Sequence, residues 1–247
     1  MDIDTINREL QKLVPTYITI PDSRKRLYTL LTLINVDIPL NICQAIERIL
    51  FKERLDPIPF DTILTNKTQY DSRIILYHGD ITRLAVDAIV NAANSEMLGC
   101  FDPSHKCIDN IIHSKAGPYL RMECRQIRRK CGELGSSARI TKAYCLPCKY
   151  IIHVAGPRVT ESLPNINQTN ELAKCYSSSL DLAKEYNLHT IAFCCISTGL
   201  YGYPKHPAAI LAINTVTKWL NTHDYDMSII FDVFTYEDHT IYTSLLH

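Results

Sequence analysis

The sequence lacks any apolar run of roughly 18 residues, the length that a helix needs to cross a bilayer, so we expect no membrane-spanning segment. It also lacks net charge, because 26 lysine and arginine residues balance 26 aspartate and glutamate residues. Direct binding to nucleic acid or to a membrane surface depends on a basic field, and we expect neither partner. The N-terminus lacks the basic and apolar regions of a secretory signal, which favours a cytoplasmic protein.

Cysteine is too sparse for a small scaffold held together by disulfides, since the 247 residues include ten cysteines. We expect reduced thiols or metal ligands instead. Hydrophobic residues make up 46% of the chain and charged residues 21%, as is usual for a globular protein with a sizeable core. The length accommodates a domain of roughly 170 residues together with an appendage.

Residues 1–70 have a helical pattern that differs from the rest of the chain. Apolar residues recur at helical spacing over residues 3–14, and Ser23 and Asn41 are candidate N-caps of two further helices. We interpret residues 1–70 as a small helical N-terminal extension. Its residues predict no chemical role of their own.

Residues 71–247 alternate between short apolar runs and helical stretches. The apolar runs predict strands at 74–77, 88–90, 150–154, 190–193 and 229–234, and helices are expected near 108–130, 168–187, 205–221 and 238–246. This alternation indicates an α/β domain with a largely buried mixed sheet. Ligands of such domains bind beyond the strand ends, so the loops there are the candidates for function.

Two short loops follow the first two predicted strands. In Gly79-Asp80-Ile81-Thr82, the aspartate could accept a hydrogen bond from an exocyclic amine such as that of adenine, although an N-cap is the more common role on this tetrapeptide alone. In Asn91-Ala-Ala-Asn94, two amides flank two small residues and could bind a sugar diol, because an amide both donates and accepts. A plain polar turn is the alternative for the second loop.

A third loop combines two thiols and one imidazole within eight residues. Cys100, His105 and Cys107 have the spacing Cys-x4-His-x-Cys, and zinc binds both side-chain types in tetrahedral geometry. Three protein ligands leave one position open for water or substrate, as in catalytic zinc sites. Two buried cysteines beside an exposed histidine are the equally good alternative on spacing alone.

A fourth loop, Ile196-Ser-Thr-Gly-Leu-Tyr-Gly202, lies between a predicted strand and a predicted helix. Backbone N–H groups in such a glycine-bearing turn can form an anion-binding nest, and the following helix N-terminus favours negative charge. A phosphate or pyrophosphate is the expected guest, with a plain loop as the alternative. The pattern fits neither the Rossmann nor the P-loop motif.

Taken together and in this order, the four loops resemble those of the macrodomain family, from about residue 73 to the C-terminus. The strings Ala116-Gly-Pro118, Glu123-Cys124, Ala138-Arg-Ile-Thr141, Leu146-Pro147 and Tyr150-Ile-Ile-His153 add to the resemblance. It implies a three-layer α/β/α fold with a mixed sheet over residues 71–247, and a site for ADP-ribose. Where most hydrolytic members have a glycine run, this chain has Cys100–Cys107, while Asp109 and His113 keep the family spacing. This variant, preceded by a helical extension, resembles the zinc-containing macrodomain subgroup and implies a Zn²⁺ cofactor.

The resemblance also implies roles for individual residues. Asp80 would hold the adenine amine, Ile81 the ring edge, and Phe234 would pack on the adenine. Asn94 would orient the distal ribose, and Asp109 matches the acidic residue associated with hydrolysis. The residues implied to surround the diphosphate are Ser197, Thr198, Gly199, Leu200, Tyr201 and Gly202. The implied zinc ligands are Cys100, His105 and Cys107.

The activity implied by the resemblance is hydrolysis of mono-ADP-ribose from protein side chains, with Asp and Glu linkages as the expected targets. Asp109 could act as a general base or orient water, and zinc could activate water or polarise a substrate oxygen. Subgroup members often accompany a sirtuin-type transferase, and some act on a lipoyl-carrier protein, which implies these partners. A module that binds ADP-ribose without turnover, an O-acetyl-ADP-ribose deacetylase and a purely structural zinc loop are the alternatives.

Other chemically noticeable residues are interpreted as structural. Cys145 and Cys148 form a CxxC pair without a second pair, so ordinary thiols are expected. His113 and His153 lie on apolar faces of predicted elements. The basic run 125–130 is interpreted as a solvated helix face.

Overall fold

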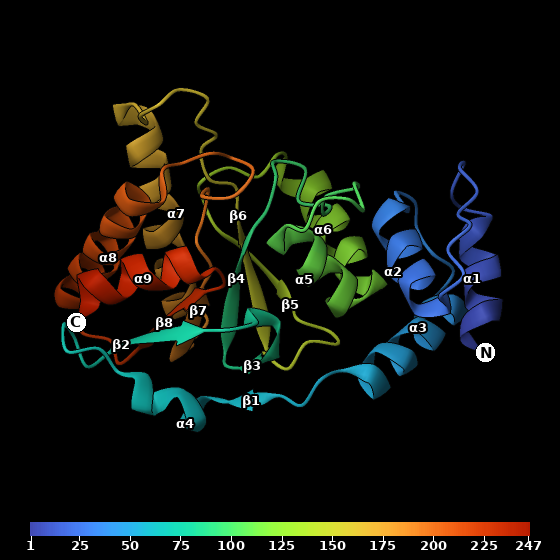
Figure 1. Ribbon diagram of the computed structural model, residues 1–247, viewed down its shortest axis with the longest axis horizontal. Helices are drawn as coiled ribbons and strands as arrows, with labels where there is room; N and C mark the ends of the chain where they lie inside the picture. Colours follow the sequence, from blue (N-terminus) through green and yellow to red (C-terminus); the bar gives the residue numbers. More distant parts are fainter.

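The computed structural model describes all residues, 1–247, and its N-terminal helices lie at one end of the molecule (Figure 1). These helices are α1 (Ile3–Gln11), α2 (Ser23–Leu33) and α3 (Leu40–Glu53). The Asp22 carboxylate accepts hydrogen bonds from the N–H groups of Arg24 and Lys25, so Asp22 caps α2. Helix α3 begins after Pro39 with no side-chain cap. The predictions of Ser23 and Asn41 as N-caps are therefore wrong by one or two residues.

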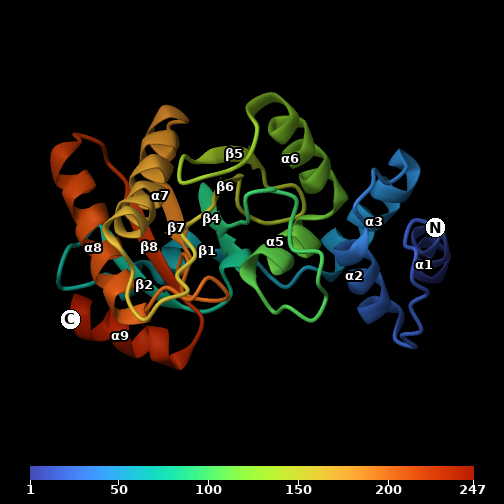
Figure 2. The ribbon, with the colours of Figure 1, turned by 90° about the horizontal axis from the view of Figure 1, so that it is seen from above.

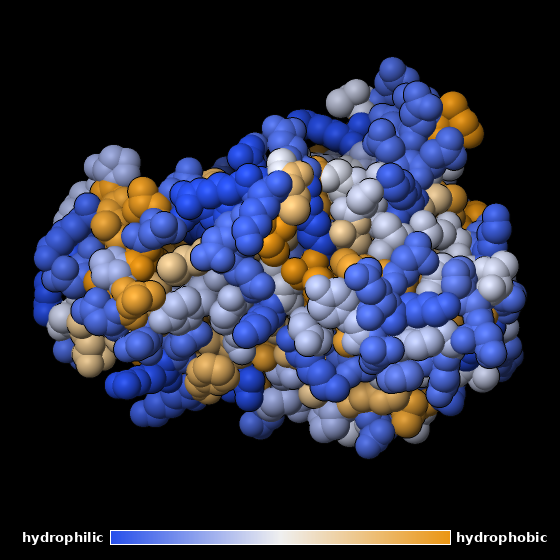
Figure 3. All heavy atoms as spheres, turned by 180° about the vertical axis from the view of Figure 1, so that it is seen from behind, coloured by the Kyte–Doolittle hydropathy of each residue, from blue (hydrophilic) through white to orange (hydrophobic).

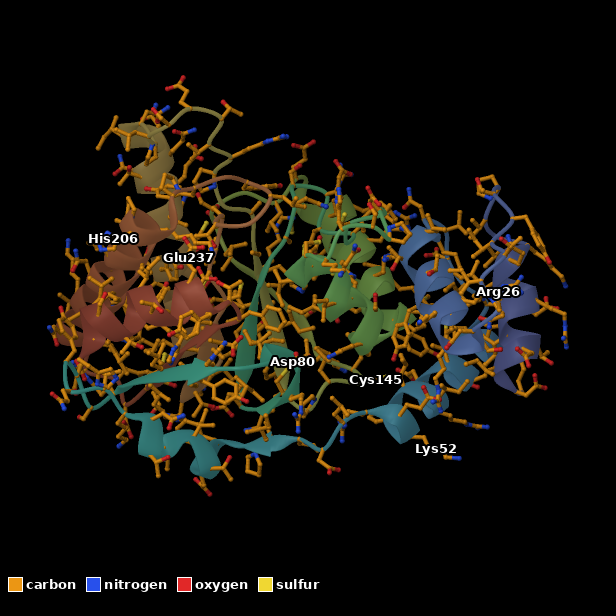
Figure 4. The ribbon with its side chains drawn as sticks, viewed as in Figure 1. Arg26, Lys52, Asp80, Cys145, His206 and Glu237 are labelled. Carbon is orange, nitrogen blue, oxygen red and sulfur yellow. The ribbon has the colours of Figure 1, made fainter.

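The three N-terminal helices enclose a hydrophobic cluster of their own. Its members include Ile6, Leu30 and Ile46, which are fully buried. One residue from the main body, Cys145, joins this cluster and lies at the boundary between the two parts (Figure 4). Because Cys145 is packed among apolar side chains, its placement agrees with the interpretation of an ordinary thiol.

The segment after α3 runs along the main body rather than forming a free linker (Figure 1). Strand β1 (Ile58–Pro59) pairs in parallel with β3 (Leu84–Ala85). It leads into α4 (Phe60–Ile63) and a 3₁₀ turn, η1 (Leu64–Asn66). Ile63 is buried in the main hydrophobic core, so the chain is anchored to the body before the first long strand.

A six-stranded mixed sheet forms the centre of the main body, in the order β2-β8-β7-β4-β6-β5. The strands are β2 (Ile74–His78), β4 (Ala88–Ala92), β5 (Arg139–Lys142), β6 (Tyr150–Val154), β7 (Thr190–Phe193) and β8 (Ser228–Val233). The five strands predicted from apolar runs are all present and pair in parallel. The edge strand β5 was not predicted as a strand, and it pairs with β6 in antiparallel orientation.

Helices cover both faces of this sheet, which confirms the three-layer α/β/α fold. The helices are α5 (Ile108–Ala116), α6 (Pro118–Cys131), α7 (Ile166–Glu185), α8 (Lys205–Thr222) and α9 (Tyr236–Leu246). Figure 2 shows α7 and α8 on one side of the sheet and α5 and α6 on the other. The single helical stretch predicted near 108–130 is broken in the structure. Gly117 has a φ of +91°, which ends α5, and Pro118 begins α6.

The outer surface is predominantly polar. On the face seen in Figure 3, hydrophobic side chains are scattered among hydrophilic ones. None of the helices combines the length and the apolar character that a membrane crossing requires.

Candidate active site

A cleft of about 780 Å³ opens where the five parallel strands end. Its walls come from the segments that follow β2, β4, β6, β7 and β8, so it lies at the carboxyl edge of the sheet, where α/β folds bind ligands. The candidate site residues that line it are Asp80, Ile81, Asn94, Cys100, His105, Cys107, Asp109, Ser197, Thr198, Gly199, Leu200, Tyr201 and Phe234. The four loops singled out in the sequence therefore meet in one cavity.

At one end of the cleft, Asp80 has the capping role considered for it, and its contact with adenine stays a prediction. Its Oδ1 accepts a hydrogen bond from the N–H of Thr82 at 3.0 Å and caps the 3₁₀ turn η2 (Ile81–Arg83). Its Oδ2 accepts from Lys115 Nζ at 2.6 Å. Burial raises the pKa of Asp80, but hydrogen bonds from Lys115 and Thr82 outweigh this and lower it overall. An ionised carboxylate with spare lone pairs thus faces the cleft from the middle of the molecule (Figure 4).

Apolar side chains lie beside Asp80. Ile81 is buried, whereas the Phe234 side chain, which follows β8, is 74% exposed at the cleft mouth. An exposed phenyl ring at the edge of a cleft is available to stack on a planar ligand.

The loop after β7 has the backbone geometry of an anion nest. Ser197 has a φ of +66°, and the N–H groups of Gly199, Leu200 and Tyr201 donate to no protein acceptor. Helix α8 begins shortly afterwards and adds its positive N-terminal end. The loop therefore presents unused donors to the cleft, as a phosphate site requires.

Gly202 differs from its neighbours, because it does not line the cleft. Its N–H donates to the carbonyl of Gly199 at 3.0 Å, and its φ is +70°. A Cβ at this position would lie 2.7 Å from the Val159 carbonyl oxygen. The structure thus shows that Gly202 closes the turn, and its contact with a diphosphate stays a prediction.

Asn94 lies at the cleft, but its amide is used by the loop that follows it. Oδ1 accepts from the N–H groups of Glu96 and Met97, and Nδ2 donates to the Gly99 carbonyl at 3.0 Å. Met97 has a φ of +61°, so the turn is tight. The Asn94 side chain consequently fixes the start of the loop that carries Cys100.

Asp109, in the first turn of α5, is 4% exposed. Its Oδ1 accepts from Asn91 Nδ2 at 2.8 Å, whereas Oδ2 has no partner. Burial raises the pKa of Asp109 to about 6, and the Asn91 hydrogen bond and the charge of Arg121 limit the rise. A buried carboxyl with a free oxygen and a pKa nearer neutrality is suited to accept a proton.

A hydrogen-bond network supports Asp109 from behind. Asn91 Nδ2 lies 3.2 Å from His153 Nδ1, and His153 Nε2 lies 2.9 Å from Thr141 Oγ1. Burial lowers the pKa of His153 to about 3, so its ring is neutral. The sequence offered the Asn91 amide as a candidate for binding a sugar diol, but Asn91 is fully buried in this network, and Thr141 was assigned no role. The Asn91-Ala-Ala-Asn94 motif was a signal for Asn91, whereas Thr141 lies on the strand that was not predicted.

The cysteine and histidine loop faces the cleft next to Asp109. Cys100 Sγ lies 3.3 Å from His105 Nδ1, and His105 Nε2 lies 3.2 Å from Asp102 Oδ2. Burial raises the pKa of Cys107 to about 11, and the neighbouring Asp109 and Cys100 add to the rise. Two thiols and an imidazole that open onto a cavity match the donor set of a zinc site with a free position. The donor types therefore suit a zinc ion, although the ligand atoms of Cys100, His105 and Cys107 are not gathered tightly around one point.

A tighter group of potential metal ligands lies elsewhere. His113, Cys124 and His153 each have one ligand atom within 4.8 Å of the others. Cys100, His105 and Cys107 do not form so close a group. All three are buried, and both ring nitrogens of His153 already face Asn91 and Thr141. Their placement agrees with the structural role expected for His113 and His153.

Two cations at the cleft were missed in the sequence. Lys115 comes from α5, and Arg158 comes from the segment after β6. Arg158 could have been found from its position just beyond a predicted strand, where ligand-binding loops occur. Arg158, which forms no ion pair, favours an anionic ligand in the cleft, whereas the charge of Lys115 is balanced by Asp80.

Comparison with known proteins agrees with this geometry. The Macro domain family model matches residues 90–212. A protein-ADP-ribose hydrolase of Staphylococcus aureus (strain MSSA476) is 47% identical over 173 residues, which are 68% of this chain and 64% of that protein. The chain thus spans just under two thirds of this relative's length. A human ADP-ribose glycohydrolase is 47% identical over 178 residues, 71% of this chain and 40% of that protein.

Solved structures extend the comparison to the fold. An Oceanobacillus iheyensis macrodomain mutant with ADPR has a TM-score of 0.63 and 35% identity, covering 69% of this chain and 90% of that one. A Trypanosoma brucei macrodomain in complex with ADP-ribose has a TM-score of 0.66 and 30% identity, covering 96% of this chain and 95% of that one. The second match includes the N-terminal helices as well as the main body.

Proposed function

The chain belongs to the macrodomain family, and on this premise we propose that it hydrolyses mono-ADP-ribose from modified protein side chains, with zinc in its active-site loop. The observation that carries the proposal is the convergence of three groups in one cleft: an anion nest, a buried carboxyl with a raised pKa, and a set of zinc-type ligands. A cavity of this kind with few convergent polar groups is the usual form of a small-molecule site.

The cleft divides into regions that suit the parts of ADP-ribose. Asp80 can accept a hydrogen bond from the adenine amine while Phe234 stacks on the ring. Residues 197–201 can donate to the diphosphate, whose charge Arg158 complements. The distal ribose then lies towards Asn94 and Asp109, where the bond to the modified protein would be broken.

Hydrolysis at that end requires a water molecule that is positioned and deprotonated. Asp109 has one oxygen held by Asn91 and one free, so it can orient a water and accept its proton. Cys100, His105 and Cys107 would hold the zinc, which when bound would supply a Lewis acid. The carboxylate linkages of modified Asp or Glu are the substrates we expect.

Asp109→Asn tests the catalytic assignment. Asparagine keeps an oxygen that can accept from Asn91 but cannot take a proton, so we expect kcat for release of ADP-ribose from a carboxylate-linked, mono-ADP-ribosylated protein to fall about 100-fold. Calorimetry should show that the variant still binds free ADP-ribose. A variant that retains full turnover contradicts the role of Asp109. Binding without turnover by the unmodified chain would identify a module that reads ADP-ribose.

A further inference from the structure

Three of the four arginines of helix α6, Arg121, Arg125 and Arg128, are spaced four and three residues apart, which places them along one face. Figures 1 and 2 both show α5 and α6 between the sheet and the N-terminal helices. The run that begins at Arg125 was interpreted as a solvated face, but the structure shows that Arg125 and Arg128 form ion pairs with other segments.

On one side of α6, Arg121 and Arg125 contact the N-terminal extension. Arg121 Nη1 donates to the carbonyl oxygens of Leu31 at 2.8 Å and Ile34 at 2.5 Å. These carbonyls lie at the C-terminal end of α2, where helix carbonyls lack partners within the helix. Arg125 forms an ion pair with Asp37, four residues after α2 ends.

On the other side of α6, Arg121 and Arg128 contact the active-site loop. The Arg121 guanidinium carbon lies 4.9 Å from the centroid of the Phe101 ring, a cation–π contact. Arg121 Nη2 lies 3.2 Å from the position of a Cβ at Gly99, so the guanidinium lies close to the Gly99 backbone. Arg128 Nη2 donates to Glu96 Oε1 at 2.7 Å. These contacts flank Cys100 on both sides.

Arg121 therefore depends on the extension for its hydrogen-bond acceptors. Its Nε is buried without a partner, and its hydrogen-bond acceptors are the two carbonyls of the extension. A partly buried cation that loses its acceptors is strongly destabilised and must move. Because Arg121 also stacks on Phe101, such a movement would remove a contact that holds the loop beside Cys100.

We propose that the N-terminal extension takes part in building the active site. Arg121 is the positioning residue: the extension holds its guanidinium, and the guanidinium in turn fixes the position of loop 95–107 at the cleft. The inference rests on the proposed function, because it assigns the loop a catalytic task. The residues of the extension predicted no chemical role, and this inference assigns the extension one. Arg121 acts through the loop and does not line the cleft.

Arg121→Lys is the first test, because lysine keeps the charge but cannot donate to two carbonyls and stack on a ring at once. We expect kcat for ADP-ribose release to fall about 100-fold, the cost of a small misplacement of reacting groups, with little change in the affinity for free ADP-ribose. Arg24→Ala is the matched control. Arg24 pairs with Glu53 within the extension at 2.9 Å, so its loss removes an ion pair without touching α6.

Phe101→Leu approaches the same contact from the loop and leaves the hydrogen bonds to α2 in place. It keeps the proposal testable if Arg121→Lys fails to fold, and we expect a smaller fall in kcat with a normal melting temperature. Normal kcat in folded Arg121→Lys or in Phe101→Leu, or an equal fall in Arg24→Ala, overturns the proposal.

A second readout does not depend on turnover. Lys106 is exposed in the loop, so trypsin cleavage after Lys106 reports how firmly the loop is held. We expect cleavage to accelerate several-fold in Arg121→Lys and to stay unchanged in Arg24→Ala. If the unmodified chain releases no ADP-ribose, the proposed function fails on its own, and the proteolysis still decides whether the extension holds the loop. Equal cleavage in the two variants overturns the inference.

Discussion

At the scale of single residues, the shape of the cleft depends on positions that leave no room for a side chain. A Cβ at Gly156 would lie 2.2 Å from Ser197 Oγ and 2.9 Å from a methyl carbon of Ile196. Gly156→Ala therefore pushes the anion nest out of place, and we expect calorimetry to show an affinity for ADP-ribose about tenfold weaker. Gly135→Ala is the control, because nothing lies within 4 Å of its added Cβ. Equal affinities of the two variants would contradict this account of the nest.

The sequence located the residues of the site more successfully than it described their contacts. Loop motifs after predicted strands predicted which side chains meet, because parallel strands bring their carboxyl ends to one edge. They could not show that the Asn94 amide already makes hydrogen bonds with the backbone of the loop that follows it. Nor could they show that Asn91 links Asp109 to His153, since that contact depends on the register between β4 and β6.

At the scale of elements, the buried parallel strands were predictable and the edge strand was not. Continuous apolar runs such as Ile74–Leu76 identify strands that are covered on both faces. Strand β5 reads Arg139-Ile-Thr-Lys142, and this short polar alternation is indistinguishable from a loop until β6 pairs with it. The break between α5 and α6 has a local cause in Gly117-Pro118, which the helical pattern alone concealed.

Asp87 ties three strands together at the edge opposite the cleft. Its carboxylate accepts from the N–H groups of His189 and Thr190, at 2.8 and 3.0 Å, and from Lys149 Nζ at 2.6 Å. Burial raises the pKa of Asp87, but these hydrogen bonds outweigh it and lower the pKa overall. The stability that Asp87 contributes is therefore complete above the ordinary carboxyl pKa and is lost as the pH falls through the lowered value.

Asp87→Asn should lower the free energy of unfolding by about 1.5–3 kcal/mol at neutral pH, as for hydrogen bonds to a charged group. Urea denaturation over a pH series measures this, and the difference from the unmodified chain should shrink at acidic pH. Asp224→Asn, at an exposed position, serves as the control. A difference that is constant over the whole series would show that the charge of Asp87 is not its cause.

At the scale of the whole molecule, two hydrophobic cores are joined through polar contacts between α6 and the extension. The extension packs around its own cluster, and α6 meets it through Arg121 and Arg125. The Trypanosoma brucei structure matches the chain over both parts, whereas the Oceanobacillus iheyensis structure covers 69% of it. Sequence periodicity predicted the helices of the extension. The polar contacts between α6 and the extension join side chains far apart in the chain, so periodicity could not predict them.

The central claim is that this cleft releases ADP-ribose from protein with the help of zinc. The most direct measurement is the release of free ADP-ribose from a carboxylate-linked, mono-ADP-ribosylated protein, before and after treatment with a zinc chelator. We predict release that the chelator abolishes and that added zinc restores, with folding unchanged by circular dichroism. Full release from a folded protein shown to be free of metal would contradict the role of zinc, and no release under any condition would contradict hydrolysis of this linkage.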